Sequence, residues 1–361
     1  MANQHRRRGR FSETYPLERQ SIRLNSWPEQ DRLAFEGARR TGDAFELTGP
    51  AASWTSETCR TRLQSYGRYL NFLNRNGLLL ASEGPADRVT PDRLTLYLAE
   101  ARLLLAANTV AQVLRALSLM LSAMVPERDW HWITRHPGAP TSTELRAGRK
   151  IKKVFNPLAL CSQALDLLDH IGTSPFADEL RVQYRDALIV AFQCIFALRR
   201  RNLVQMVLGR NLIIGDGVIH VIFKAEETKN WSSIRCTIPD FLKPYLFTYL
   251  YEVRPALLAG NTSDAVWIGS RHQALEYGAC PYLFHSIGMR LLGYPITCHT
   301  FRHSAATAIL TKDPRKIRIA AGQLMHDGLR TVNQYYDLSG EAGSQRAWEN
   351  LRRDILRGRG A

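Results

Sequence analysis

The chain of 361 residues is 45% hydrophobic and 22% charged, a composition typical of globular proteins and not of disordered or fibrous ones. At about 150 residues per domain, this length predicts roughly two to three domains. The chain holds 48 lysines and arginines against 33 aspartates and glutamates, which gives a formal net charge of +15. Such a surplus indicates a polyanionic partner, either nucleic acid or an anionic membrane surface, and weighs against a metabolic enzyme with an acidic surface.

The sequence carries no recognisable signal for secretion or for spanning a membrane. The most apolar segment, residues 187–198, contains Gln193 and is shorter than the roughly twenty apolar residues that a spanning helix needs. The basic first residues are not followed by the apolar run of a signal peptide. The six cysteines are scattered without a CxxC pair, which predicts reduced thiols in a cytoplasmic protein and neither a disulfide framework nor a zinc site.

The first part of the chain is predicted to be a basic extension followed by a helical domain. Residues 1–52 form the N-terminal arm and extension, and the first ten of them hold four arginines and no acid. This arm could lie along phosphates or be a solvated tail. Between residues 53 and 135 the apolar side chains recur at helical spacing, which predicts four or so helices. Thr55 and Thr90-Pro91 are expected helix starts, and Gly77 is an expected stop.

A basic linker leads into the second part. Residues 136–153 begin with proline, glycine, serine and threonine and end in a run of lysines and arginines. Asn156-Pro157 then provides an N-cap and a first helical residue, and a nearly apolar helix over 180–198 is expected at the centre of the core.

Strand patterns follow this helix. Two apolar segments rich in β-branched residues, 212–214 and 218–223, flank Gly215-Asp-Gly217 and predict a hairpin, and residues 233–239 predict a third strand. Helical spacing resumes at Phe241 and continues to the end. The predicted fold class is therefore mainly α, with one small three-stranded antiparallel sheet.

Standard nucleotide and metal motifs are missing from the sequence. It contains no Walker A loop, no GxGxxG and no HExxH. His299 and His303 stand at i and i+4 and could bind a metal, but His299 has no glutamate beside it and no third ligand has a clear spacing. We therefore expect neither a metal nor a cofactor.

What remains is a set of arginine, histidine, lysine and tyrosine side chains. The first group lies in Ala197-Leu-Arg-Arg-Arg-Asn-Leu203 at the end of the apolar helix, where an arginine can offer paired donors to two phosphate oxygens. In the second group, His299 and Arg302 stand at i and i+3 and share one face of a helix. The third is Leu324-Met-His326, followed nine residues later by Tyr335.

Together these segments resemble the sequence boxes of the tyrosine recombinase (phage integrase) family. HTFRHSAATAIL looks like the family's HxLRHxxAT box, LMHDGLRTVNQYY looks like LGHxxxxTTxxY, and LRRRNL looks like LRxSEL. The resemblance covers about residues 155–337, and it implies a catalytic domain at 154–337 followed by a tail helix within 338–361. Residues 53–135 are similar, as a pattern only, to the family's helical core-binding (SAM-like) domain, which binds DNA.

The resemblance implies roles for six residues. The implied catalytic set is Arg199, Lys229, His299, Arg302, His326 and Tyr335. Tyr335 matches the nucleophile by its offset from the third histidine, whereas Tyr336 is one residue out of register and remains the alternative. Lys229 matches the hairpin lysine, and Lys224 remains the alternative because the length of this hairpin varies. His303 matches the family's neighbouring structural histidine.

The residue types also suit the chemistry of a phosphodiester. Arg199 and Arg302 can hold its two non-bridging oxygens, and the histidines can add hydrogen bonds. A phenol, with a pKa near 10, has to lose its proton, and His299 can act as the base. Lys229 can protonate the leaving 5′ oxygen. Attack by the tyrosine leaves a 3′-phosphotyrosine that keeps the energy of the phosphodiester, so rejoining needs neither ATP nor metal.

Three positions depart from the family pattern. Asn202 replaces the acid that follows the first arginine, Phe301 replaces a leucine, and Met325 replaces the glycine before the third histidine. These changes indicate a divergent member, and the first leaves open how Arg199 is held. Arg200, beside it, is expected to be a surface or DNA-backbone contact, and so is Arg201.

The resemblance implies a site-specific recombinase that acts on double-stranded DNA through a Holliday junction. It also implies a homotetramer with accessory recombination proteins, in the cytoplasm with the nucleoid, with no membrane partner and encoded by a mobile element. The apolar stripe of the tail helix at 345–356 could pack in cis, or on a neighbouring protomer as in similar recombinases. The alternatives are a type IB topoisomerase, which acts alone with little sequence preference, and a non-catalytic DNA-binding protein that retains the fold.

Overall fold

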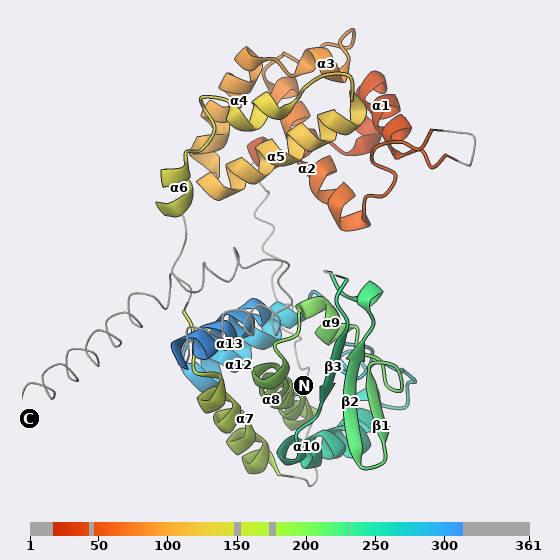
Figure 1. Ribbon diagram of the computed structural model, residues 1–361, viewed down its shortest axis with the longest axis vertical. Coiled ribbons are helices and arrows are strands. Elements are labelled where there is room, and N and C mark those ends of the chain that lie inside the picture. The colour runs from red at the N-terminus through yellow and green to blue at the C-terminus, as the bar shows by residue number, and fades with distance from the viewer. Residues whose placement is uncertain (1–16, 43–46, 148–152, 173–177, 230, 313–361) are drawn as a thin grey trace, which may run out of the picture. The chain divides into compact units, whose positions relative to one another are not determined.

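The computed structural model describes residues 17–42, 47–147, 153–172, 178–229 and 231–312 (Figure 1). The chain divides into two compact units, Met1–Ile151 and Lys152–Ala361. Within the described ranges no helix is both long and apolar enough to cross a membrane. The predicted N-terminal arginine cluster and the predicted tail helix lie outside these ranges.

In its described residues the first unit contains helices and no strand. Its helices are α1 (Glu29–Arg39), α2 (Ser56–Arg75), α3 (Pro85–Arg88), α4 (Pro91–Leu104), α5 (Ala107–Met124) and α6 (Ser142–Ala147), with 3-10 turns at Leu17–Arg19, Leu24–Ser26 and His131–Arg135. The predicted helix starts are confirmed, because Thr55 accepts a hydrogen bond from the Thr58 amide and Thr90 accepts one from the Arg93 amide, each at 3.3 Å.

Helix α1 lies in the segment that the sequence reading treated only as an extension. It packs on α5, and its Phe35 belongs to the core of the unit. The carboxylate of Asp31, fully buried, accepts a hydrogen bond from Arg88 Nε at 2.8 Å and another from the Tyr66 hydroxyl. These two hydrogen bonds of Asp31 connect α1 to α2 and α3. The residues of α1, which lie before the predicted 53–135 range, therefore belong to the same helical unit.

The second unit combines helices with one small sheet. Its helices are α7 (Pro157–Ile171), α8 (Asp178–Phe196), α9 (Arg200–Val204), α10 (Lys243–Thr248), α11 (Arg254–Leu258), α12 (Cys280–Leu292) and α13 (Cys298–Lys312), with a π-helical turn at Tyr249–Val253 and 3-10 turns at Ala225–Glu227 and Asp240–Leu242. The strands are β1 (Leu212–Gly215), β2 (Val218–Phe223) and β3 (Ile234–Thr237). The predicted fold class is confirmed.

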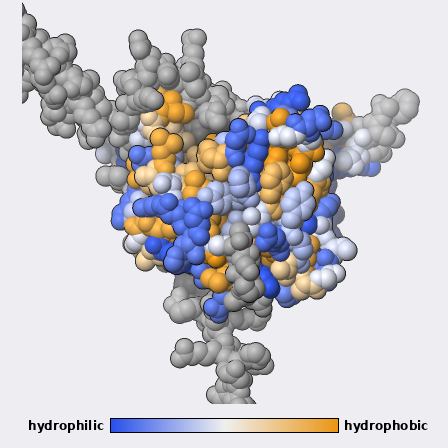
Figure 2. Space-filling view, turned by 90° about the horizontal axis from the view of Figure 1, so that it is seen from below, coloured by the Kyte–Doolittle hydropathy of each residue, from blue (hydrophilic) through white to orange (hydrophobic). Residues whose placement is uncertain are grey.

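The sheet is antiparallel in the order β1-β2-β3, so that Val221 pairs with both Leu212 and Cys236. Helix α8 forms the centre of the core and packs along α7, as its nearly apolar sequence predicts. In Figure 1 the helices α7, α8, α12 and α13 lie together beside the sheet. The face in Figure 2 intersperses hydrophilic and hydrophobic residues over the described part of the chain.

Candidate functional site

The apolar helix α8 ends earlier than the sequence predicts. Its last residue is Phe196 and not Leu198, because Ala197 adopts the left-handed conformation with φ of 45°. Arg199 is in extended backbone and serves as the N-cap residue of α9, and its carbonyl accepts a hydrogen bond from the Leu203 amide at 3.0 Å. Arg199 is thus held in a short break between two helices.

A buried glutamine fixes the conformation of this break. Gln193 is fully buried, and its side chain makes the two hydrogen bonds that a neighbouring strand would make. Its Oε1 accepts from the Leu198 amide at 2.9 Å, and its Nε2 donates to the Leu198 carbonyl at 3.1 Å. Because buried backbone groups need partners, Gln193 allows the chain to leave the helix inside the core.

The same break is joined to α13 through Cys298. Gln193 Nε2 lies 3.0 Å from Cys298 Sγ, and that thiol donates to the Leu198 carbonyl at 3.2 Å. Burial raises the pKa of the Cys298 thiol to about 12, so the thiol keeps the proton that it donates. The residue that precedes His299 therefore contacts the residue that precedes Arg199.

Arg302 makes a second connection between these segments. Its side chain is buried, and its Nη1 donates to the Ala197 carbonyl at 2.7 Å. On the same helix the rings of His299 and His303 lie 4.4 Å apart, nearly perpendicular to one another. The fold thus brings together the two arginine segments, which are far apart in the sequence, and α13 carries His299 one turn before Arg302.

The β2–β3 connection, which carries both candidate lysines, is attached to α9. Asn202 is buried, and its Nδ2 donates to the Glu227 carbonyl at 3.0 Å. The Glu227 carboxylate accepts from the Lys224 amide at 2.8 Å. Lys224 and Lys229 are both exposed, so their side chains are open to a ligand, and the preference for Lys229 stays a prediction. Asn202 stands at the position of the family's acid. Here it holds the β2–β3 connection, which we call the lysine loop, to α9, three residues after Arg199.

The two other arginines of the segment differ in their surroundings. Arg200 stacks on the Tyr277 ring with its guanidinium 3.7 Å from the ring centroid. Arg201 is exposed, and its Nε donates to Gln205 at 3.1 Å.

Part of the predicted set lies outside the described ranges. His326, Tyr335 and the alternative Tyr336 belong to residues 313–361, which the structure does not describe. In the part of the chain that it does describe, no group of three or more metal-ligating side chains occurs. The assignments of the site residues stay predictions.

The sequence reading missed three residues that shape the break. Ala197, Gln193 and Cys298 had no assigned role, although a glutamine inside a long apolar run is a visible signal. A buried amide needs partners, and the backbone of Leu198 provides them here.

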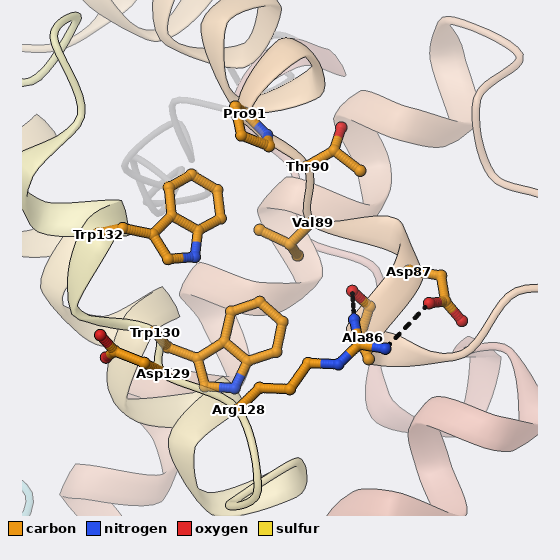
Figure 3. Close-up of a pocket in the computed structure, with 9 residues that line it drawn as sticks. All are labelled: Ala86, Asp87, Val89, Thr90, Pro91, Arg128, Asp129, Trp130 and Trp132. Carbon is orange, nitrogen blue, oxygen red and sulfur yellow. Dashed lines mark hydrogen bonds and ion pairs between the residues drawn. The ribbon is translucent and has the colours of Figure 1, made fainter.

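The first unit has a separate hollow of about 590 Å³ near the start of α4 (Figure 3). Trp130 and Trp132 line it together with Val89 and Pro91. Arg128 closes one end, where it donates to the Ala86 carbonyl at 3.2 Å. None of the predicted catalytic residues lines this hollow.

The loss of the Gln193 side chain gives a testable prediction for the site. Replacing Gln193 with Leu leaves the buried Leu198 amide without its partner and leaves the Leu198 carbonyl with the Cys298 thiol alone, so we expect the free energy of unfolding to fall by about 1–3 kcal/mol. DNA cleavage should fall further than DNA binding, because the Arg199 backbone loses its support. Thermal unfolding and a cleavage assay measure the two effects, with Gln205→Leu, at the exposed C-cap residue of α9, as the control. Cleavage at the wild-type rate in a folded Gln193→Leu variant would contradict this role.

Comparison with known proteins shows which family this chain resembles. The model of the phage integrase family matches residues 162–341. The tyrosine recombinase XerD of Staphylococcus epidermidis is 26% identical over 158 residues, which are 43% of this chain and 51% of the relative. The matched segment thus spans about half the length of this curated relative.

Two solved structures share the fold. Both are of the XerH site-specific recombinase bound to difH substrate. The post-cleavage complex has a TM-score of 0.54 at 17% identity and covers 81% of this chain and 79% of its own. The pre-cleavage complex has a TM-score of 0.51 at 16% identity and covers 77% and 76%. Because the family model spans the arginine break, the lysine loop and α13, the chain belongs to the phage integrase family of tyrosine recombinases.

Proposed function

We propose that the chain is a site-specific DNA recombinase that cleaves and rejoins double-stranded DNA through a 3′-phosphotyrosyl intermediate and a Holliday junction. One observation carries this proposal: the Arg302 guanidinium reaches the Ala197 carbonyl at 2.7 Å, which joins the helix of His299 and Arg302 to the break that holds Arg199. Arg199 from the break and Arg302 from α13 can then converge on one phosphate.

Each residue of the proposed site has a chemical task. Arg199 and Arg302 neutralise the non-bridging oxygens, on which charge grows in the transition state. His299 and His326 donate or accept protons there, and Tyr335 attacks the phosphorus and displaces the 5′ oxygen. Lys229 supplies the proton that this oxygen takes. Neither ATP nor a metal enters these steps, since the covalent bond stores the energy for rejoining.

The remaining assignments follow from a DNA substrate. The net charge of +15 supports a grip on the duplex backbone that weakens as salt rises, since each neutralised phosphate releases a counterion. We propose that the helical first unit, including the predicted 53–135 core-binding domain, clamps the duplex. Residues 154–337 would carry the catalysis. Pairing of two sites would need a homotetramer, linked through the tail at 338–361, in the cytoplasm where the chromosome lies.

The test of this function is the capture of the covalent intermediate. The protein is incubated with a nicked suicide duplex that carries the end sequence of the element encoding it, and the products are separated on a denaturing gel. We expect a protease-sensitive adduct at the 3′ end of the cut strand and a free 5′-hydroxyl. Strand exchange between two such sites would separate a recombinase from a type IB topoisomerase. Sequence-specific binding without an adduct would favour a non-catalytic DNA-binding protein.

Arg302→Lys should lower cleavage roughly 10²- to 10³-fold, while DNA binding changes little. A single ammonium cannot bond the Ala197 carbonyl and also offer paired donors to a phosphate. Single-turnover cleavage under saturating protein measures the change. Arg201→Lys is the matched control, because Arg201 is exposed on α9 and bonds only Gln205 in the described contacts. Equal cleavage by the wild type and Arg302→Lys would remove Arg302 from the site.

A further inference from the structure

The loop between β2 and β3 presents an exposed tryptophan that the proposed chemistry does not use. Trp231 is 75% exposed, although its ring is among the largest apolar side chains. Its φ of 52° lies in the left-handed region, which costs a bulky residue about 1–2 kcal/mol. Backbone strain of this kind gathers at functional sites, because the surrounding structure has to hold it in place.

The base of the loop holds this strained conformation. The Trp231 amide lies 3.4 Å from the Thr228 carbonyl. The Thr228 hydroxyl is nearly buried, accepts from the Ser232 amide at 3.0 Å and lies 2.9 Å from the Ser232 carbonyl. Thr228 and Ser232 are thus bonded to each other on either side of Trp231, while the indole of Trp231 stays in solvent.

The position of the loop connects Trp231 to the proposed site. Lys229 lies two residues before it on the same loop. The Asn202 side chain holds the Glu227 carbonyl at 3.0 Å and so attaches the loop to α9, whose N-cap residue is Arg199. Tyr282 on α12 and Tyr277 in the turn before α12 are also exposed aromatic residues, but they lie outside this loop, and the Tyr277 ring is covered by the Arg200 guanidinium. Trp231 is thus an exposed aromatic side chain on the same loop as Lys229.

We propose that Trp231 stacks on an unstacked nucleobase of the DNA substrate beside the cleaved phosphate. The inference rests on the proposed function. An indole offers an uncharged π face, which a base matches and a phosphate does not, and stacking of this kind contributes about 1–3 kcal/mol per base. Bases inside an intact duplex already stack on their neighbours, so the contact forms where the duplex opens. Lys229 then acts on the DNA backbone at the leaving 5′ oxygen, while Trp231 stacks on the adjacent unpaired base.

The test compares two labelled DNA probes with the full-length protein. One is an intact 30-base-pair duplex of arbitrary sequence, and the other is the same duplex with a three-nucleotide gap in one strand. Trp231→Ala should weaken binding to the gapped duplex roughly 5- to 100-fold and leave binding to the intact duplex within about twofold. Trp231→Phe should keep most of the affinity, and Tyr282→Ala, which removes an exposed aromatic from α12, should change neither.

The outcomes separate this inference from the proposed function. If the wild type binds neither probe, the DNA-acting function fails and the inference fails with it. If the wild type binds both and Trp231→Ala binds like the wild type, the inference alone is overturned. An equal loss on both probes would assign Trp231 to the duplex backbone and would also overturn it. Quenching of tryptophan fluorescence by the gapped probe, lost in Trp231→Phe, would support the stacked contact.

Discussion

Tyr335→Phe should form no covalent adduct with the suicide substrate, which is a complete loss within the limits of the gel. Phenylalanine keeps the ring and removes the oxygen that attacks phosphorus, so DNA binding should stay at the wild-type level. The choice of Tyr335 rests on its position nine residues after His326 in the family's third box. A binding assay on the intact site, run beside the cleavage gel, separates lost chemistry from lost binding.

Tyr336→Phe is the matched control for this prediction. It removes the same oxygen from the adjacent residue, and neighbouring side chains point in different directions in a helix or a strand. We expect Tyr336→Phe to form the adduct at a rate near that of the wild type. An adduct that survives Tyr335→Phe and disappears in Tyr336→Phe would move the nucleophile by one residue. An adduct that survives both changes would exclude this tyrosine pair.

Local signals in the sequence predicted much of the fold. Thr55 and Thr90 cap their helices through their own hydroxyl groups, and Asn156 caps α7, so these starts depend only on nearby residues. The β1–β2 hairpin likewise follows from its turn, where Asp216 and Gly217 both adopt positive φ angles of 49° and 72°. Such features need no information from distant parts of the chain.

The features that the sequence did not predict depend on distant contacts. Helix α8 was expected to reach Leu198, but Gln193, Cys298 and Arg302 together stabilise a break after Phe196. Two of these three residues lie on α13, and no local pattern links them to the break. The helix α1 was missed for a similar reason, since its Asp31 is buried against Arg88 from α3.

In the candidate site, too, the sequence predicted the local motifs but not the contacts between distant segments. The boxes named Arg199, His299 and Arg302 because family motifs are local, and the contacts that join those boxes became visible only in three dimensions. Asn202 is the clearest example of a residue whose role became visible only in the structure. As a departure from the family pattern it left the support of Arg199 open, whereas in the fold it bonds the Glu227 carbonyl and holds the lysine loop.

Lys229→Ala should lower cleavage of an ordinary phosphodiester roughly 10²- to 10⁴-fold, the range expected for loss of a general acid. The leaving 5′ alkoxide is a strong base and needs a proton as the bond breaks. A substrate with sulfur in place of that bridging oxygen should restore most of the rate, because a thiol, with a pKa near 8.5, leaves as the thiolate without a proton. Single-turnover adduct formation on the two substrates measures both effects.

Lys224→Ala distinguishes the two lysines of the loop. Lys224 is exposed and carries the same charge, and its backbone amide, which bonds Glu227, survives the substitution. We expect this variant to cleave oxygen and sulfur substrates in the same ratio as the wild type, with at most a weaker grip on DNA. The sulfur substrate restores the rate only where the missing group is the proton donor. The variant whose cleavage it restores therefore identifies the general acid, even if either substitution also weakens DNA binding. Rescue of Lys224→Ala and not of Lys229→Ala would transfer the role to Lys224, and rescue of neither would place the acid outside this loop.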